Sequence, residues 1–258
     1  MSIHFEIKDK VKRNLFTQMI QSIAMFSNET SFQFEMDRLY IQGMDYSHVM
    51  LFEIDLQKKW FNQYIIDKPS CISLSLKFLS KILNMKWDDH IVSLEHKDNT
   101  EEVNIAMKSN TTFTSMFTLP LYDIDHETMT IPDSKHQCLF QSNSLEMKKI
   151  MNQLSLFSDT VKITISNDKI EFESISEDLG KNKIKIPKKL CDELTLENGK
   201  SFHSEFNLMF LQKCLSHYFT PKVQFYLTDE NPLQMKFTLD DNISNIRFFL
   251  APKVEDTE

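Results

Sequence analysis

The sequence predicts an α+β protein made of two pseudo-symmetric halves, each an antiparallel sheet with its helices on one face. One pattern, an amphipathic helix followed by a strand, a tight turn and a second strand, occurs four times along the 258 residues. Its copies divide evenly between the two halves of the chain, which indicates internal pseudo-symmetry. Strands outnumber helices and their connections are short, which favours antiparallel pairing.

In each copy, apolar residues at helical spacing identify the helix and alternating residues identify the strands. The apolar positions of the four helices fall within Leu15–Ile23, Leu76–Leu83, Leu145–Leu154 and Phe210–Leu215. The strands are expected at Ser31–Met36, Leu39–Gln42, His90–Glu95, Val103–Met107, Val161–Ile165, Ile170–Phe172, Val223–Leu227 and Leu233–Phe237.

The segment between the halves, Tyr122–His136, is acidic, irregular and contains Pro132, so it is expected to be an exposed linker. We therefore expect one domain over residues 1–121, a connecting loop over 122–137 and a second domain over 138–258.

The composition argues against several kinds of chemistry. The three glycines lie far apart, so the chain contains no GxGxxG motif, Walker A loop or GxSxG elbow. The four cysteines have no CxxC spacing and the eight histidines form no HExxH motif, so we expect no metal and no cofactor. We interpret the cysteines as small apolar core residues of a protein in a reducing compartment.

The first ten residues lack the pattern of a signal peptide, and no stretch of about 18 apolar residues occurs. We therefore expect an intracellular protein that does not contact a membrane.

Charge is distributed unevenly over this acidic chain. The helical segments 8–26, 74–86, 143–157 and 206–218 carry net charges of +3, +3, +1 and +1. Since the whole chain has a net charge of −8, the remainder carries −16. Lys77 and Lys81 lie four residues apart and share one helix face opposite the apolar stripe. Such a face suits a polyanion contacted through its phosphates, although ordinary solvated helix faces would explain the same residues.

Four motifs, in order along the chain, resemble one family. Gln42–Val49, Leu79–Leu83, Ile131–Pro132 after the acidic Asp123–Asp125, and Phe248–Asp256 are similar to segments of the proliferating cell nuclear antigen (PCNA) family, the eukaryotic-type sliding clamps. The resemblance extends from about Phe5 to Glu258.

The resemblance implies a DNA-clamp fold in which three copies form a ring around duplex DNA. The ring would bind DNA of any base sequence. The helices would line the hole and the sheets would form the outer wall. The ring would tether DNA polymerase and other replication or repair proteins through their clamp-binding peptide motifs. An ATP-driven clamp loader would open it, and the clamp itself would not be an enzyme. The expected location is the nucleus, or a viral replication compartment if a virus encodes the chain.

The resemblance also implies three sets of site residues. The DNA channel is expected to contain Lys12, Arg13, Lys77, Lys81, Lys148, Lys149, Lys213 and His217. The partner-peptide pocket is expected to contain Met44, His48, Met129, Ile131, Pro232, Phe249, Ala251 and Pro252. The subunit interface is expected to contain Phe113, Met116, Phe117, Lys183, Ile184 and Ile186.

Each set has a simpler interpretation. Met44 and Phe249 could be core residues near the surface, and the interface segments could be ordinary edge strands protected by lysines. The chain also departs from the family pattern. Several channel positions where the family usually has a cation are neutral here, including those near Gln18, Ala24, Asn84, Asn152 and Met209. The lysine that carries ubiquitin in many members is Asn167 here.

Three alternatives remain open at this point. The chain could be one subunit of a hetero-oligomeric clamp, or a processivity factor that acts as a monomer, as in some viruses. It could also be a hydrolytic enzyme whose acidic residues lie in turns, using Asp88, Asp89 and His90, or Asp240 and Asp241. Such short acidic clusters are a weak signal of catalysis.

Overall fold

The computed structural model describes residues 3–85, 90–109, 111–124, 129–131, 136–199, 201–229, 231–239 and 241–253. The chain divides into two units, each described here by itself. Unit 1 comprises Met1–Tyr46, Phe52–Met129 and Leu239–Ile246, and unit 2 comprises Ser47–Leu51, Thr130–Thr238 and Arg247–Glu258. The connecting loop predicted over 122–137 lies partly outside the described residues, and the predicted domain limits stay a prediction.

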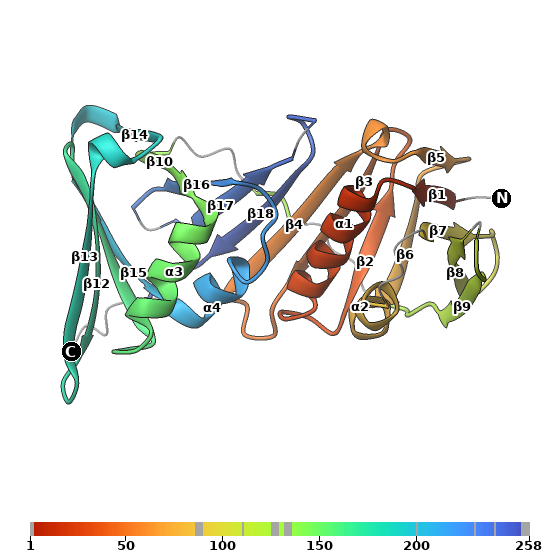
Figure 1. Cartoon of the computed structure of the whole chain (residues 1–258), viewed down its shortest axis with the longest axis horizontal. Coiled ribbons are helices and arrows are strands. Elements are labelled where there is room, and N and C mark those ends of the chain that lie inside the picture. Colours follow the sequence, from red (N-terminus) through yellow and green to blue (C-terminus); the bar gives the residue numbers. More distant parts are fainter. Residues whose placement is uncertain are drawn as a thin grey trace. The chain divides into compact units, whose positions relative to one another are not determined.

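The two halves of the chain repeat one order of elements (Figure 1). The first half contains β1 (Ile3–Ile7), α1 (Lys10–Ile23), β2 (Glu29–Phe34), β3 (Arg38–Met44), β4 (Met50–Gln57), η1 (Lys58–Trp60), β5 (Gln63–Ile66), β6 (Ser70–Ser75), α2 (Leu76–Leu83), β7 (His90–His96), β8 (Glu102–Ser109) and β9 (Ser115–Pro120). The second contains β10 (Cys138–Asn143), α3 (Ser144–Leu154), β11 (Thr160–Ile165), β12 (Lys169–Ser176), β13 (Gly180–Pro187), η2 (Lys188–Leu190), β14 (Glu193–Leu196), η3 (Glu197–Gly199), β15 (Phe202–Asn207), α4 (Leu208–Cys214), β16 (Lys222–Leu227), β17 (Leu233–Thr238) and β18 (Asn245–Leu250).

The strands also pair in the same order in both halves. In the first half the orders are β5-β1-β7-β8-β9 and β4-β3-β2-β6, and in the second half they are β14-β10-β16-β17-β18 and β13-β12-β11-β15. The described pairs within them are antiparallel, as in β1 with β7 and β11 with β12. By this order β9 corresponds to β18 and β13 corresponds to β4. The predicted α+β class, with two similar halves, is therefore confirmed.

A phenylalanine on the first strand of each half joins that half's two groups of strands. In unit 1 the Phe5 ring lies 5.8 Å from Phe16 of α1 and 6.3 Å from Phe34 of β2, measured between ring centroids. In unit 2 Phe140 stacks on Phe225 at 4.4 Å and meets Phe172 of β12 at 6.3 Å. Aromatic side chains bury large areas, so these contacts hold much of each core together.

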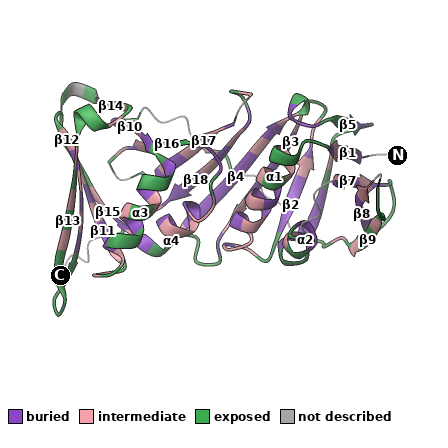
Figure 2. Ribbon diagram, in the orientation of Figure 1, coloured by how far each residue is buried: buried purple, intermediate pink, exposed green. Residues whose placement is uncertain are grey.

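The helices cover one side of the sheet in each unit, and each has a buried and an exposed side (Figure 2). Within the units, α1 packs against α2 and α3 packs against α4. Each of these helices begins at or before the first apolar residue of the pattern, directly after a polar residue that caps its start. Asp9, Ser75, Asn143 and Asn207 accept hydrogen bonds from backbone N–H groups of the first turn.

Two expectations about individual residues are wrong. Leu145 was expected on the buried stripe of its helix but is 49% exposed, whereas Met147 is fully buried. Met147, Met151 and Leu154 are the buried apolar residues of α3, at spacings of four and three. All four cysteines are free, but Cys71 is exposed and Cys191 is half-buried, so only Cys138 and Cys214 belong to the core.

Gly43 in β3 is required by close packing. A Cβ atom at this position would lie 2.4 Å from Cζ of Phe52, which is closer than atoms can approach. β3 therefore lies directly against the Phe52 ring of β4, and a side chain at residue 43 would displace that ring.

We expect Asn143→Ala to destabilise unit 2 through the start of α3. The Asn143 carboxamide oxygen accepts hydrogen bonds from the N–H groups of Leu145 at 2.9 Å and Glu146 at 3.1 Å. Losing this cap costs about 1 kcal/mol. Urea unfolding would measure the change, with Gln153→Ala on the exposed side of the same helix as the matched control. Equal midpoints for the two variants would contradict the assigned cap.

Candidate nucleic-acid interface and partner surfaces

The predicted channel cations differ in how far their charges reach solvent. Lys77 and Lys81 lie on the exposed side of α2, and Lys149 lies on the exposed side of α3. The Lys81 ammonium lies 5.9 Å from the centroid of the exposed Phe78 ring. These three side chains are accessible to an anionic ligand, as the helical spacing predicted for Lys77 and Lys81.

Two predicted cations on α1 are bound to backbone carbonyl groups instead. Lys12 Nζ donates to the carbonyl oxygen of Trp60 at 2.8 Å and lies 5.5 Å from the centroid of the Trp60 ring. Arg13 Nη1 donates to the carbonyl oxygen of His90. Both side chains are half-buried, so they connect α1 to other parts of unit 1. Their heads would have to leave these carbonyls to reach a phosphate directly.

The predicted cations near the end of α4 have a similar arrangement. Lys148 Nζ donates to the carbonyl oxygen of Ser216, which connects α3 to the residues after α4. Burial, together with the nearby Lys148 ammonium, lowers the pKa of His217 below its ordinary value of 6.5. His217 is therefore neutral at pH 7. Lys213 is half-buried, with its ammonium 5.6 Å from the Phe210 ring.

Large apolar side chains on the exposed helix sides were not predicted. Val11, Phe78, Leu145 and Met209, one from each helix, are 73%, 51%, 49% and 49% exposed. The same helices carry the lysines and the neutral Gln18 and Asn152, and Asn84 directly follows α2. The helix surfaces in each unit thus combine a few cations with amide and apolar groups. Composition could not reveal this, because it does not tell which apolar residues point outward.

The predicted pocket residues belong to both units. Met44 and Met129 are in unit 1, and the remaining six are in unit 2. Met129, His48 and Pro232 are exposed, while Met44, Ile131, Ala251 and Pro252 are half-buried. Phe249 is only 8% exposed, so its ring is mainly a core group. The simpler interpretation of Phe249 as a core residue is therefore supported, and a peptide could touch only a small part of its ring.

Backbone hydrogen bonds hold the C-terminal segment within unit 2. The N–H of Ala251 donates to the carbonyl oxygen of Val49 at 2.9 Å, and the N–H of Lys253 donates to that of Glu205 at 2.8 Å. His48, next to Val49, has a backbone φ of 59°, which is unusual for a residue other than glycine. The tail therefore lies against the turn that presents His48.

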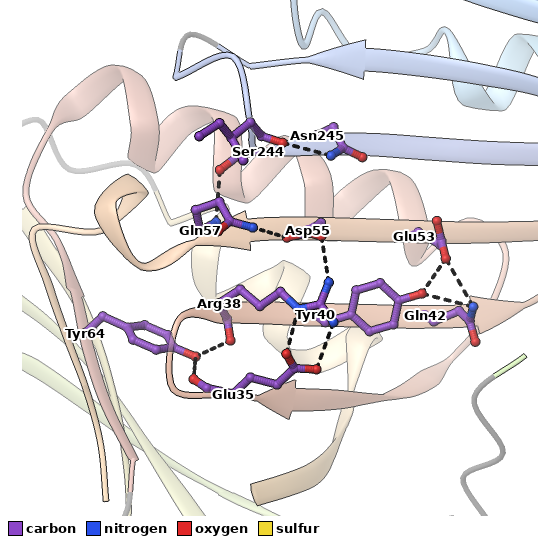
Figure 3. Close-up of polar contacts among 11 residues, drawn as sticks. Glu35, Arg38, Tyr40, Gln42, Glu53, Asp55, Gln57, Tyr64, Ser244 and Asn245 are labelled. Carbon is purple, nitrogen blue, oxygen red and sulfur yellow. Dashed lines mark hydrogen bonds and ion pairs between the residues drawn. The ribbon is translucent and has the colours of Figure 1, made fainter. Parts of the chain in front are cut away.

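A polar network organises the strands that lead to this turn (Figure 3). Arg38 of β3 forms ion pairs with Glu35 at 2.7 Å and with Asp55 of β4 at 3.0 Å. Tyr64 donates to backbone carbonyl oxygens at the β2–β3 turn, those of Glu35 and Arg38. One guanidinium thus connects the turn to the neighbouring strand in unit 1.

The predicted interface residues lie on or beside two end strands, β9 and β13. Phe113 and Met116 are 54% and 72% exposed, and Phe117 is half-buried. Along β13, the half-buried Ile184 and Ile186 alternate with exposed lysines. On that exposed face, Lys183 pairs with Glu173 at 3.2 Å and Lys185 pairs with Glu171 at 3.3 Å. Among the described strands, each of these two therefore has one backbone edge without a neighbouring strand, next to apolar side chains.

The residues of the hydrolase alternative do not form a described site. Asp88, Asp89 and Asp240 lie outside the described residues. His90 is buried, and Asp241 accepts hydrogen bonds from the N–H groups of Ile243 and Ser244 and from the Ser244 hydroxyl. Burial raises the pKa of Asp241, but these hydrogen bonds outweigh it and lower the pKa below its ordinary value. Asp241 therefore serves to shape its turn.

The described part of the chain has neither a metal-binding cluster nor a membrane-spanning helix. No group of three or more His, Cys, Asp or Glu side chains there could hold a metal ion. Among the helices described, none combines the length and apolar character needed to cross a membrane.

Comparisons with known proteins agree with the repeated fold. The family model for the PCNA N-terminal domain matches residues 5–129, and the model for the PCNA C-terminal domain matches residues 130–253. "Proliferating cell nuclear antigen 2" of Drosophila melanogaster is 29% identical over 85% of this chain and 86% of its own length. "Proliferating cell nuclear antigen" of Chaetomium thermophilum is 26% identical over 95% of this chain and 96% of its own length. Because the two models together cover nearly all of a chain whose halves repeat one fold, the protein belongs to the PCNA family.

Proposed function

We propose that this protein is a DNA sliding clamp: three copies close into a ring around duplex DNA and tether replication and repair enzymes. Membership of the PCNA family supports this function. The clamp performs no chemistry; an ATP-driven loader places it on DNA. It acts in the nucleus, or in a viral replication compartment if a virus encodes it.

The repeated strand order carries the ring proposal. β9 and β13 are end strands and correspond to β18 and β4 in the other half. We propose that β9 of one copy pairs with β13 of the next. Phe117 would then lie on the same face as Ile184 and Ile186, Met116 would lie on the opposite face, and Phe113 would contact the neighbour from just before β9. Because the two edges differ, this contact is head-to-tail, and head-to-tail contacts close into rings when the rotation permits.

The molar mass in solution tests the ring. Light scattering behind a sizing column should give about 92 kDa, three times the 30.5 kDa of one chain. Replacing Ile184 with Lys should lower the mass to that of one chain, because it places a charge in the apolar part of the interface. A mass near 30.5 kDa for the unaltered protein would favour a monomeric processivity factor or a subunit of a hetero-oligomeric clamp.

We further propose that phosphate contacts are made chiefly by Lys77, Lys81 and Lys149. These side chains are exposed, whereas Lys12, Arg13 and Lys148 donate to backbone carbonyls. Lys213 and the neutral His217 would line the channel and contribute less charge. Since a closed ring is held on DNA by topology, a modest number of cations is enough.

Replacing both Lys77 and Lys81 with Glu should weaken association with linear duplex DNA. It should also reduce the slope of the logarithm of the association constant against the logarithm of salt concentration. The reduction should be roughly one for each lysine that contacts a phosphate. Fluorescence anisotropy over a salt series would measure this, with light scattering to verify that the mass is unchanged.

Lys12→Met is the matched control for this experiment. It also removes one positive charge, but from an ammonium bound to the Trp60 carbonyl oxygen. We expect it to lower the unfolding midpoint and to leave the salt dependence nearly unchanged. If Lys12→Met flattened the salt dependence as much as the α2 changes, the assignment of phosphate contacts to exposed lysines would be wrong.

For partner proteins, we propose that the eight pocket residues bind a short peptide with aromatic anchors. Support comes from family membership and from the chemistry of the residues, which are mainly apolar and include two methionines. Methionine side chains are flexible and polarizable, so one surface can adapt to several partners. Half-buried and exposed residues such as Ile131 and Met129 would supply most of the contact, and Phe249 would support them from the core.

Ile131→Glu should abolish binding of a fluorescent peptide that carries two adjacent aromatic anchors, because it places a carboxylate on an apolar contact. Folding should be retained, since Ile131 is only half-buried. Ile65→Glu, at an exposed isoleucine on β5, is the matched control and should bind normally. Equal affinities for the two variants in an anisotropy titration would mean that the peptide binds elsewhere.

A further inference from the structure

The side chain of Gln42 on β3 holds the backbone of Met129, 87 residues later in the chain and in the same unit. The N–H of Met129 donates to Gln42 Oε1 at 2.8 Å, and Gln42 Nε2 donates to the carbonyl oxygen of Met129 at 2.9 Å. One carboxamide therefore binds both backbone groups of one residue, as a neighbouring strand would. The pair resembles a single rung of a β-ladder made by a side chain.

Two neighbours orient the Gln42 carboxamide (Figure 3). The Tyr40 hydroxyl donates to Glu53 Oε1, and Gln42 Nε2 lies 3.2 Å from the same oxygen and 3.1 Å from the Tyr40 hydroxyl. A carboxylate only accepts hydrogen bonds, so the NH₂ end of the carboxamide must face Glu53. If the carboxamide were turned over, its oxygen would face the carboxylate and its NH₂ would face the N–H of Met129. Glu53 and Tyr40 thus select the orientation that binds Met129.

This group is buried, which makes its geometry costly to change. Gln42 and Glu53 are each 3% exposed and Tyr40 is 8% exposed. A buried polar group without a hydrogen-bond partner destabilises the protein, because it has lost its water and gained nothing in return. The arrangement in which all three side chains are hydrogen-bonded is therefore strongly favoured. Gln42 is therefore a rigid support, whereas its hydrogen-bond partner Met129 lies at the surface and is 38% exposed.

A second anchor holds the start of the same segment. The N–H of Tyr122 donates to the carbonyl oxygen of Ser73 on β6 at 3.0 Å, in an isolated antiparallel bridge. The bridge uses backbone groups of both residues, so side-chain changes at Gln42 leave its donor and acceptor in place. It serves as an internal reference for the Met129 contact.

We propose that Gln42, oriented by Tyr40 and Glu53, is the positioning residue that fixes the backbone of Met129 for partner binding. Its carboxamide holds the Met129 backbone in one register, while the Met129 residue remains 38% exposed. The inference rests on the proposed function, since Met129 and Ile131 are proposed peptide contacts. A peptide then meets an ordered surface, and less ordering has to occur on binding.

Hydrogen exchange at single amides tests the contact without any peptide. In the unaltered protein, the Met129 amide should be protected, as should the Tyr122 amide. Gln42→Leu keeps a similar volume but removes both hydrogen bonds, so the Met129 amide should exchange about tenfold faster or more, with Tyr122 unchanged. Gln33→Leu, which removes a carboxamide from neighbouring β2, should change neither amide. An unprotected Met129 amide in the unaltered protein would overturn the proposal, even if no variant folded.

Glu53→Gln tests the orienting step while Gln42 is kept. An amide at residue 53 can offer N–H groups, so the Gln42 carboxamide is no longer held in one orientation. The Met129 amide should then exchange at a rate between those of the unaltered protein and Gln42→Leu. A rate equal to that of the unaltered protein would overturn the orienting role of Glu53.

Peptide affinity tests the consequence for function. Anisotropy titration with the peptide that carries two adjacent aromatic anchors should show about tenfold weaker binding to Gln42→Leu, and normal binding to Gln33→Leu. Unchanged affinity in a variant whose Met129 amide has lost protection would overturn the positioning role. If the unaltered protein bound no peptide while its Met129 amide was protected, the proposed pocket would fail and the Gln42 contact would stand.

Discussion

The fold depends on one phenylalanine on the first strand of each half, Phe5 in the first and Phe140 in the second. Each ring packs against the second group of strands in its own half. Phe5 reaches Phe34 of β2 and Phe16 of α1, and Phe140 reaches Phe172 of β12. Each unit therefore has a core that binds its two strand groups and its first helix into one body. With this core in place, the exposed sides of the helices and the end strands are positioned within each unit.

The same packing determines which charges remain accessible. Lys12 and Arg13 are on the first turn of α1, close to the backbone of Trp60 and His90, so their heads satisfy carbonyl oxygens within unit 1. Lys77 and Lys81 point away from the body and stay exposed. A count of cations along the sequence treats these residues alike. Their surroundings divide them into a structural group and a group accessible to ligands, which bears on how strongly the protein holds DNA.

Gln42 and its neighbours show how buried polar groups can hold a residue that lies at the surface. Gln42 lies in the motif that first indicated the family, next to Gly43, whose missing side chain leaves room for Phe52. Buried Tyr40 and Glu53 orient its carboxamide, which binds the backbone of Met129. One side chain of a short strand therefore holds the backbone of a residue 87 positions away in the chain.

The sequence by itself determined the α+β class, the repeated halves and the approximate positions of the four predicted helices. These features depend on the local periodicity of apolar residues. That periodicity is visible in the sequence without knowledge of which distant segments are in contact. Tertiary structure alone decided that Leu145 is exposed and Met147 buried, that Phe249 is a core group, that Lys12, Arg13 and Lys148 bind carbonyls, and that Gln42 holds Met129. Each of these facts depends on contacts between residues distant in the chain, and a side chain's burial and partners are set by those contacts.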